Sequence, residues 1–468
     1  MHLKNWRALF LAALLSVSPS TVGAEDFYFG ADLSYVNEME DCGATYRMDG
    51  VQRDPYEIFR ASGHNLVRLR LFHTPTWTNY STLDDVRRSI RRARAAGMQV
   101  LLDFHYSDDW ADGEKQWIPA AWAAIPTTEA LAQAVYDYTL QTLQSLNAEG
   151  LMPEMVQVGN ETNREILGRT DWDWANRPID WTRNAALLNA GIRAVRDAGR
   201  GASVQPQIML HVAQPENVEP WFVAATQAGV TDYDLIGISY YRKWSSQAPE
   251  GLGQVINRVR HRYNKGVILV ETSYPWTQDS ADSAANLLGP DTLLEGYPAT
   301  VEGQRRYMVD ITQTVISNGG IGVVYWEPAW VSSHCSTRWG QGSHWENATY
   351  FDFHRGNELL PAALYTRHAY EWLRPVTFRF EGVPANVERL FLWGDFLGSR
   401  QFVASVQRGE DGAFVYKTRL RTGQELRFQI YDRLPLGEGL IPPTEARTRA
   451  VVARVGDGPT TFTYGLQR

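Results

Sequence analysis

Apolar and polar positions follow two alternating periods along most of the chain, one typical of helices and one typical of short strands. Between residues 26 and 375 a unit recurs in which an amphipathic helix leads through a glycine-containing turn to a short apolar strand. The predicted strands are 27–33, 66–71, 99–105, 155–159, 207–212, 234–240, 267–271 and 321–326, and the predicted helices include 84–96, 181–198, 219–228, 254–264 and 304–317. Eight strands alternating with helices over roughly 350 residues predict an α/β fold, a (β/α)8 barrel.

A doubly wound open sheet is the structural alternative to a barrel. Such a sheet more often carries a glycine-rich nucleotide-binding loop after its first strand. The first predicted strand here is followed by SYVNEMEDCG, which lacks that pattern. The barrel is therefore the preferred interpretation for residues 25–375.

The pattern changes after Pro375. Segments 387–393, 414–420 and 426–431 alternate between apolar and polar residues and are separated by turn-forming residues. Residues 376–468 are therefore predicted to form a small antiparallel β-sandwich. Because no low-complexity linker precedes it, we expect this domain to pack against the barrel.

The first 24 residues have the pattern of a secretory signal peptide. Lys4 and Arg7 precede a short apolar run at 8–17, and Val22-Gly23-Ala24 resembles a cleavage site. The apolar run is too short to span a bilayer as a helix. We expect a secreted or periplasmic protein without a membrane span.

Composition adds two further indications. The formal net charge is −8 without a long run of one sign, so the basic stripe of a nucleic-acid-binding protein is missing from the sequence. The chain contains 17 Trp and 22 Tyr, and several Trp, such as Trp110 in SDDWAD and Trp345 in HWEN, have polar neighbours. Most aromatic rings are expected in the core, but rings beside hydrogen-bonding groups suit the binding of sugars.

Polar residues occur where the predicted strands end, which is where a (β/α)8 barrel carries its chemistry. Alternation in 67–71 places Arg68 and Arg70 on the face opposite the apolar residues, towards the barrel interior, where each needs a carboxylate partner. Arg70 lies nearer the active end. Other strands carry or end in polar residues as well: Asp103, His105, His211 and Tyr240. Each alone has a structural explanation, but their convergence on one rim indicates a site.

Two glutamates give the strongest indication of function. Glu161 follows Asn160 at the end of the fourth strand, and Glu271 ends the seventh strand, across the barrel mouth. Their carboxyl groups can approach to about 5–5.5 Å, the separation found in retaining glycosidases. Their surroundings must then keep one protonated and one ionised. We expect Arg70 to hold Glu271 ionised, Tyr240 to hydrogen-bond it and Asn160 to bind a sugar hydroxyl; surface ion pairs are the alternative.

The chain resembles glycoside hydrolase family 53, the endo-β-1,4-galactanases. The resemblance rests on GADLSYV (30–36), NLVRLRLFHTP (65–75), LLDFHYSDDWADG (101–113), VQVGNET (156–162), ISYYRKW (238–244), VETSYPWT (270–277) and YWEPAW (325–330), which occur in order across the barrel. It implies that Glu161 is the acid/base, that Glu271 is the nucleophile, and that the enzyme cuts the β-1,4-galactan side chains of pectin internally. The expected substrate-binding residues are Arg70, His105, Trp110, Asn160, Tyr240, Trp276 and Trp326.

Some members of this family bind calcium after the seventh strand through the pattern Asp-x-Asp-x-His-x-Asn. In the corresponding stretch 280–286 only Asp282 and Asn286 match, although Asp279 offers a further carboxylate. Calcium requires six to eight oxygen ligands. We expect no required cofactor, and calcium binding is disfavoured.

The chain has two cysteines, Cys42 after the first strand and Cys335 after the eighth. These strands become neighbours when a barrel closes, and an exported protein favours disulfides. We hypothesise that Cys42 and Cys335 form a disulfide on the catalytic face; two free buried thiols are the alternative.

Two rival functions remain open. An endo-mannanase or endo-glucanase of the same clan would share the fold and both glutamates, whereas a non-catalytic carbohydrate-binding barrel would not need them. The C-terminal region faintly resembles the immunoglobulin-like modules of starch- and glycogen-active enzymes in VERLFLWGDFLG, which implies either a packing or a sugar-binding role. We expect a monomer that acts on a polysaccharide.

Overall fold

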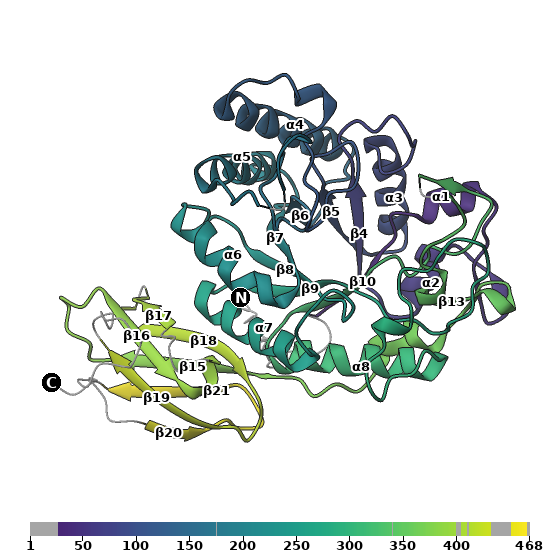
Figure 1. The fold of residues 1–468 in the computed structure, drawn as a ribbon. Coiled ribbons are helices and arrows are strands. Elements are labelled where there is room, and N and C mark those ends of the chain that lie inside the picture. The colour runs from purple at the N-terminus through teal and green to yellow at the C-terminus, as the bar shows by residue number, and fades with distance from the viewer. Residues whose placement is uncertain are drawn as a thin grey trace, which may run out of the picture.

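Figure 1 shows the computed structural model of the chain. It describes residues 27–465 except 175, 339, 399–403, 410 and 432–450. The predicted signal peptide, residues 1–24, lies outside the described residues.

Eight parallel strands form a closed barrel in the order β1-β10-β9-β8-β7-β6-β5-β4. They are β1 (Tyr28–Asp32), β4 (Leu66–Leu71), β5 (Gln99–Phe104), β6 (Met155–Val158), β7 (Gln207–Ala213), β8 (Leu235–Ser239), β9 (Gly266–Thr272) and β10 (Gly322–Tyr325). This confirms the predicted (β/α)8 fold, and each strand begins and ends within one residue of its predicted bounds.

Alternation along β4 illustrates how the barrel is filled. Leu66 belongs to an interior cluster at the base of the barrel, whereas Val67 and Leu69 pack in the larger core that includes the surrounding helices. Arg68 and Arg70 continue the inward face towards the mouth. The apolar base thus supports a polar mouth.

The helices α2 (Pro55–Ala61), α3 (Leu83–Ala95), α4 (Thr128–Ala148), α5 (Trp181–Gly199), α6 (Pro215–Gln227), α7 (Pro249–Tyr263) and α8 (Val301–Ser317) surround the barrel, and the short α1 (Val36–Asp41) follows β1. Helices α6 and α7 begin four and five residues earlier than predicted, because Pro215 and Pro249 occupy the first helical position. Proline is favoured there, since its fixed φ suits a helix and its missing N–H has no partner to lose.

Short strands are added in the loops after the first and last barrel strands. The strands β2 (Arg47–Met48), β3 (Val51–Gln52), β13 (Phe351–Asp352) and β14 (Glu358–Leu359) form one small sheet, and β11 (Ser336–Thr337) pairs with β12 (Gly340–Gln341). The register Glu358↔Arg47 joins segments that are far apart in the sequence. These pairings fix the loops that bound one side of the barrel mouth.

The C-terminal domain consists of two sheets packed face to face, β18-β15-β21 and β17-β16-β19-β20. Its strands are β15 (Arg374–Glu381), β16 (Arg389–Gly394), β17 (Ala404–Gln407), β18 (Phe414–Leu420), β19 (Glu425–Tyr431), β20 (Val451–Arg454) and β21 (Thr460–Gly465). All pairs are antiparallel except β15 with β21, and β15 begins two residues before the predicted domain boundary. The domain lies beside α7 (Figure 1), where Asn257 Nδ2 donates to the Phe396 carbonyl at 3.3 Å.

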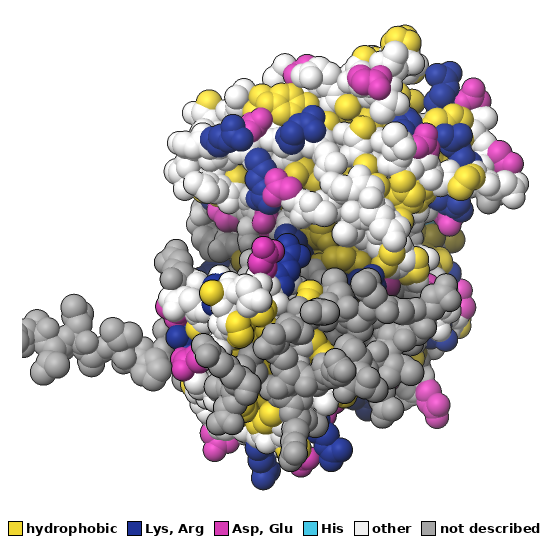
Figure 2. All heavy atoms as spheres, turned by 90° about the vertical axis from the view of Figure 1, so that its left-hand side faces the viewer, with side chains coloured by type: hydrophobic (Ala, Val, Ile, Leu, Met, Phe, Trp, Pro, Cys, Tyr) yellow, Lys and Arg dark blue, Asp and Glu magenta, His cyan; other side chains and the backbone are white. Residues whose placement is uncertain are grey.

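Figure 2 shows one face of the molecule, on which side chains of both charges are interspersed over the described part of the barrel and the sandwich. Within the described ranges, none of the helices combines the length and the apolar character that a membrane crossing requires.

Candidate active site

A cleft of about 820 Å³ opens at the carboxyl ends of the barrel strands. Its polar lining comes from β1, β4, β5, β9 and the segment after β6, and its aromatic lining comes mainly from loops. The polar residues include Asp32, Arg68, Arg70, Asp103, His105, Asn160, Glu161 and Glu271, and the rings are Trp110, Tyr241, Trp244, Trp326, Trp330 and Trp345.

Glu161 and Glu271 face each other in this cleft. One carboxylate oxygen of each lies within 4.8 Å of the other. Glu271 should point outwards by strict alternation along β9, because Ile268 and Val270 fill the interior. The register with both neighbouring strands shifts at this point, however, so that Ser239 pairs with Glu271 one step after Ile238 pairs with Leu269. This β-bulge turns the Glu271 side chain into the mouth.

Glu161 reaches the cleft through a different irregularity. Its backbone is left-handed, with a φ of +43°, and follows Gly159 at +85°. A non-glycine residue adopts this conformation only where its surroundings compensate. The backbone N–H of Glu161 donates to His211 Nδ1 at 3.2 Å, and His211 Nε2 lies 2.8 Å from the Ser239 hydroxyl. His211 therefore supports the turn that carries Glu161.

Arg68, rather than Arg70, binds Glu271, which corrects one prediction. Its Nη1 contacts Glu271 Oε1 at 2.6 Å and Asp32 at 3.0 Å, and its Nη2 contacts Asp103 at 2.8 Å and Asn160 Oδ1 at 2.7 Å. All of these groups are buried. Three carboxylates of the cleft thus share a single guanidinium.

Arg70 lines the same cleft with other partners. Its Nη1 lies 3.3 Å from Glu327, and its guanidinium lies over the Trp110 ring, 4.0 Å from the centroid. Arg70 is two residues nearer the rim than Arg68, a rise of about 6–7 Å along the strand. That step removes it from Glu271 and brings it to the aromatic wall.

Tyr241, rather than the predicted Tyr240, hydrogen-bonds Glu271: its hydroxyl donates to Oε2 at 3.0 Å. Tyr240 packs in the outer core with Ile238, and its hydroxyl donates to the Gln247 carbonyl at 3.0 Å. The alternation of β8 continues to this point, so odd-numbered residues face the barrel interior. The sequence signal for Tyr241 was present in that alternation.

The remaining predicted binding residues divide into two groups. His105, Trp110, Asn160 and Trp326 line the cleft. Both ring nitrogens of His105 are engaged, Nε2 by Asp103 at 3.1 Å and Nδ1 by the Ala111 N–H at 3.0 Å, so this ring supports the wall. Trp276 does not line the cleft, which corrects that prediction. It is 5 % exposed, and its indole N–H donates to the Glu346 carbonyl beneath the loops.

The two glutamates differ in the partners that set their protonation. Burial raises the pKa of Glu161, and hydrogen bonds from Ser239 and the Gly113 N–H oppose the rise. Burial also raises the pKa of Glu271, against the attraction of Arg68 and with repulsion from Glu161. Because two adjacent negative charges repel, the pair retains one proton. Arg68 and Tyr241 stabilise the charge on Glu271, so the proton belongs on Glu161.

Among the described residues, one group has the spacing of a metal site: Glu161, His211 and Glu271. Both nitrogens of His211 are already hydrogen-bonded within the protein. Burial lowers the pKa of His211 well below its usual range, so the ring is neutral. The arrangement supports the glutamate pair and does not fit a metal ion.

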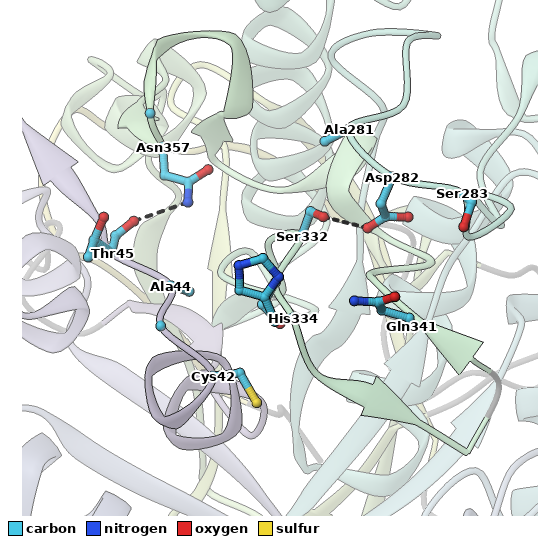
Figure 3. A pocket seen from close by; sticks show the side chains of 13 residues that line it. Cys42, Ala44, Thr45, Ala281, Asp282, Ser283, Ser332, His334, Gln341 and Asn357 are labelled. Atoms are coloured by element: carbon cyan, nitrogen blue, oxygen red, sulfur yellow. Dashed lines mark hydrogen bonds between the residues drawn. The ribbon is translucent and has the colours of Figure 1, made fainter.

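Cys42 and Cys335 are bonded to each other and join the loop after β1 to the loop after β10. Beside this disulfide lies a second, polar cavity of about 450 Å³ (Figure 3), in which His334 lies between Thr45 and Asn357 on one side and Asp282 and Gln341 on the other.

The stretch 280–286, where the family resemblance suggested calcium ligands, makes several contacts within the protein. Asp282 accepts hydrogen bonds from the Ser332 hydroxyl at 2.5 Å and from the Ser343 and Ala284 N–H groups at 2.8 Å. Burial and the neighbouring Asp282 raise the pKa of Glu346 to about 8, and its Oε1 accepts the Ala281 N–H at 2.8 Å. Calcium requires six or more oxygen ligands, and two buried oxygens beside Asp282, Glu346 Oε2 and Asn286 Oδ1, have no hydrogen-bond partner among the described residues; the expected absence of calcium stays a prediction.

Comparison with known proteins shows the family to which the chain belongs. Residues 28–365 match the profile of glycosyl hydrolase family 53. The chain belongs to this family. It is 51 % identical over 368 residues, 78 % of this chain and 98 % of the relative, to an arabinogalactan endo-β-1,4-galactanase of Cellvibrio japonicus (strain Ueda107). It is also 38 % identical over 319 residues, 66 % of this chain and 71 % of the relative, to an endo-β-1,4-galactanase of Bacillus subtilis (strain 168).

The solved structures agree. The family 53 catalytic domain of Ignisphaera aggregans superimposes with a TM-score of 0.68 at 31 % identity, covering 75 % of this chain and 98 % of that one. The family match ends at residue 365, so β15 to β21 lie beyond it.

Proposed function

We propose that the protein is an endo-acting, retaining β-1,4-galactanase. One observation carries the mechanism: a carboxylate oxygen of Glu161 lies within 4.8 Å of one of Glu271, while Arg68 holds Glu271 at 2.6 Å. This closeness suits direct attack by one carboxylate and leaves no room for the intervening water of an inverting enzyme. The galactanase names of the family 53 relatives support the substrate.

In the first step Glu271 attacks the anomeric carbon as the bond to the leaving sugar breaks. Glu161 donates its proton to the leaving oxygen, which departs as a hydroxyl, and a galactosyl ester of Glu271 remains. In the second step Glu161, now ionised, removes a proton from water, and the resulting hydroxide attacks the anomeric carbon. Glu271 departs as a carboxylate, Glu161 is protonated again, and the configuration is retained after two inversions.

The aromatic walls supply the binding surface for a sugar chain. Trp110, Trp326 and Trp345 line the cleft around the two glutamates, and Trp244, 45 % exposed, lies further out. Such rings pack against the C–H faces of sugars, and the amide of Asn160 lies beside Glu161. We further propose that the reaction needs no cofactor and no calcium, and that the protein is exported; a monomer stays a prediction.

The test is hydrolysis of β-1,4-galactan, β-mannan and carboxymethyl-cellulose by the wild-type protein and by Glu271→Gln. We expect activity on galactan alone, with viscosity falling before many reducing ends appear, and no detectable activity in the variant. Proton NMR should show the β-anomer as the first product. Activity on mannan or cellulose would reject the substrate and keep the mechanism, whereas an α-anomer would reject the mechanism.

A further inference from the structure

The two sides of the cleft offer different groups to a sugar chain. On the side of Glu271, the ring of Tyr241 lies 6.0 Å from that of Trp345, which lies 4.6 Å from that of Trp326. Around Glu161 the lining is polar and comes from the segments that follow β5, β6 and β7. It includes Gly113, Glu114, Lys115, Asn163 and Gln214.

In the proposed reaction the leaving sugar occupies the Glu161 side. The attacking carboxylate and the leaving oxygen lie on opposite sides of the anomeric carbon. The leaving sugar therefore points away from Glu271, and its O4 receives the proton of Glu161. The polar lining around Glu161 is thus the part of the protein that this sugar meets.

Several polar side chains of this lining are already bound within the protein. Lys115 and Glu114 form ion pairs at 2.7 and 3.0 Å. The Asn163 amide uses both of its atoms on the backbone of Ala213, donating to the carbonyl at 3.0 Å and accepting the N–H at 2.7 Å. The side-chain amide of Gln214 differs, because nothing in the described part of the chain hydrogen-bonds it.

The backbone of Gln214 is unusual as well. This residue joins β7 to α6 with a φ of +58°, in the region that favours glycine. Its N–H donates to the Ser239 carbonyl at 2.9 Å, and the two bonds of Asn163 fix the residue before it. Short polar side chains are preferred before a helix because they accept its first N–H groups, but the glutamine accepts none of them. An outlier whose side chain has no internal role indicates a function.

Gln214 adjoins the segment that binds the acid. The Gly113 N–H donates to Glu161 Oε2 at 3.2 Å. A Cβ on Gly113 would lie 3.7 Å from the Cβ of Ala213 and 3.5 Å from the amide of Asn163. The end of β7 therefore packs against the glycine that hydrogen-bonds the acid, and the next residue, Gln214, extends this wall of the cleft.

We propose that Gln214 binds the leaving sugar of the galactan chain through its side-chain amide. This inference rests on the proposed function, because it assigns one residue to that reaction. An amide offers an acceptor oxygen and two donor hydrogens, so it can bind two neighbouring hydroxyl groups of a pyranose at once. It holds the sugar so that O4 faces the proton of Glu161.

The experiment compares two leaving groups. Galactan releases a sugar chain, whereas nitrophenyl β-1,4-galactobioside releases nitrophenolate, which carries no sugar hydroxyl. Gln214→Ala should lower kcat/KM on galactan by about fivefold or more, the effect of one lost hydrogen bond, and change that of nitrophenolate release by less than about twofold. Gln214→Gly removes the amide and accepts the positive φ, so it should show the same difference even if Gln214→Ala folds poorly. Equal losses on both substrates, or no loss on galactan, overturn the proposal.

A second measurement does not depend on the amount of folded protein. With the nitrophenyl substrate as donor and galactobiose as acceptor, a hydroxyl of galactobiose replaces water, gives its proton to Glu161 and attacks the anomeric carbon. The acceptor then occupies the position of the leaving sugar, so the ratio of transfer to hydrolysis should fall by about threefold or more in both Gln214 variants.

Gln207→Ala is the matched control, since Gln207 is an exposed glutamine at the opposite end of β7. Its ratio of transfer to hydrolysis should equal that of the wild type. An unchanged ratio in the Gln214 variants, or the same fall in Gln207→Ala, overturns the proposal. Failure of the wild type to cleave galactan would instead reject the proposed function, so the two failures are distinguishable.

Discussion

The two sides of the barrel mouth carry the same residue type in opposite electrostatic surroundings. On the β9 side, Glu271 meets a guanidinium at 2.6 Å and a tyrosine hydroxyl at 3.0 Å. On the β6 side, the donors to Glu161 are neutral: the Gly113 N–H at 3.2 Å and the Ser239 hydroxyl. Burial favours the neutral form of both carboxyls, so the partners decide which one ionises first. The difference supports the proposal that Glu161 is the acid and Glu271 the nucleophile.

The backbone treats the two sides differently as well. A bulge in β9 turns Glu271 inwards, whereas a left-handed residue after β6 turns Glu161. Neither glutamate would reach its position from a regular strand. The energetic cost of both irregularities is concentrated where the chemistry takes place.

Replacing Glu161 should have the largest effect, because it removes one of the two carboxyl groups whose surroundings differ. We expect Glu161→Gln to lower kcat/KM on galactan by about 10²–10⁴-fold, the usual contribution of a general acid. On a nitrophenyl β-1,4-galactobioside the rate of the first step should fall by less than about tenfold, because nitrophenolate leaves without protonation. Stopped-flow release of nitrophenolate separates that step from deglycosylation.

The pH profile sharpens this test. The acid function of Glu161 is present below its pKa and is lost as the pH rises through it, so burial moves the alkaline limb of the wild type to higher pH. In Glu161→Gln this limb should disappear for the nitrophenyl substrate. Glu114→Gln is the control, since Glu114 lines the same cleft but pairs with Arg164. Equal losses on both substrates would assign the acid elsewhere.

The sequence predicted the regular part of the molecule well because alternation and glycine turns are local signals. Each barrel strand was placed within a residue, and both arginines of β4 were correctly predicted to face inwards. The carboxylate that each arginine contacts depends on how far β9 is displaced relative to β4 along the axis of the closed barrel. No local sequence pattern contains that displacement. Arg68 and Arg70 were exchanged for this reason.

The other misses have different causes. Tyr240 ends the predicted strand, but continued alternation along β8 favours Tyr241. Trp276 lies in a loop, where neither period applies, and its burial beneath Phe353 follows from packing between distant segments. Trp244 and Trp330 likewise needed the folded loops to be recognised as cleft residues.

Removing one hydroxyl should produce an intermediate effect on the Glu271 side. Tyr241→Phe deletes a hydrogen bond to a charged group, worth about 1.5–3 kcal/mol. The ionised form of Glu271 is then less stable and its pKa rises. Because the nucleophile must be ionised, the acid limb of kcat/KM should move upwards by about one pH unit, with roughly tenfold lower activity near pH 5. Tyr240→Phe, its matched neighbour, should leave the limb in place, and a shift in both variants would refute the assignment of Tyr241.

The smallest effect is expected from calcium, which tests whether protein groups alone create the difference between the two glutamates. With Asp282 held by Ser332, Ser343 and Ala284, chelation by EDTA should change kcat/KM less than twofold. Thermal unfolding in EDTA and in 5 mM CaCl₂ tests whether a calcium ion binds. For a site of moderate affinity this concentration is roughly 100 Kd, so a bound ion would stabilise the folded state by about 2.7 kcal/mol. The melting temperature would then rise by several degrees. A rise of that size, lost in Asp282→Asn, would show that a cation holds the loop beside the cleft and that its charge belongs in the electrostatics of Glu271.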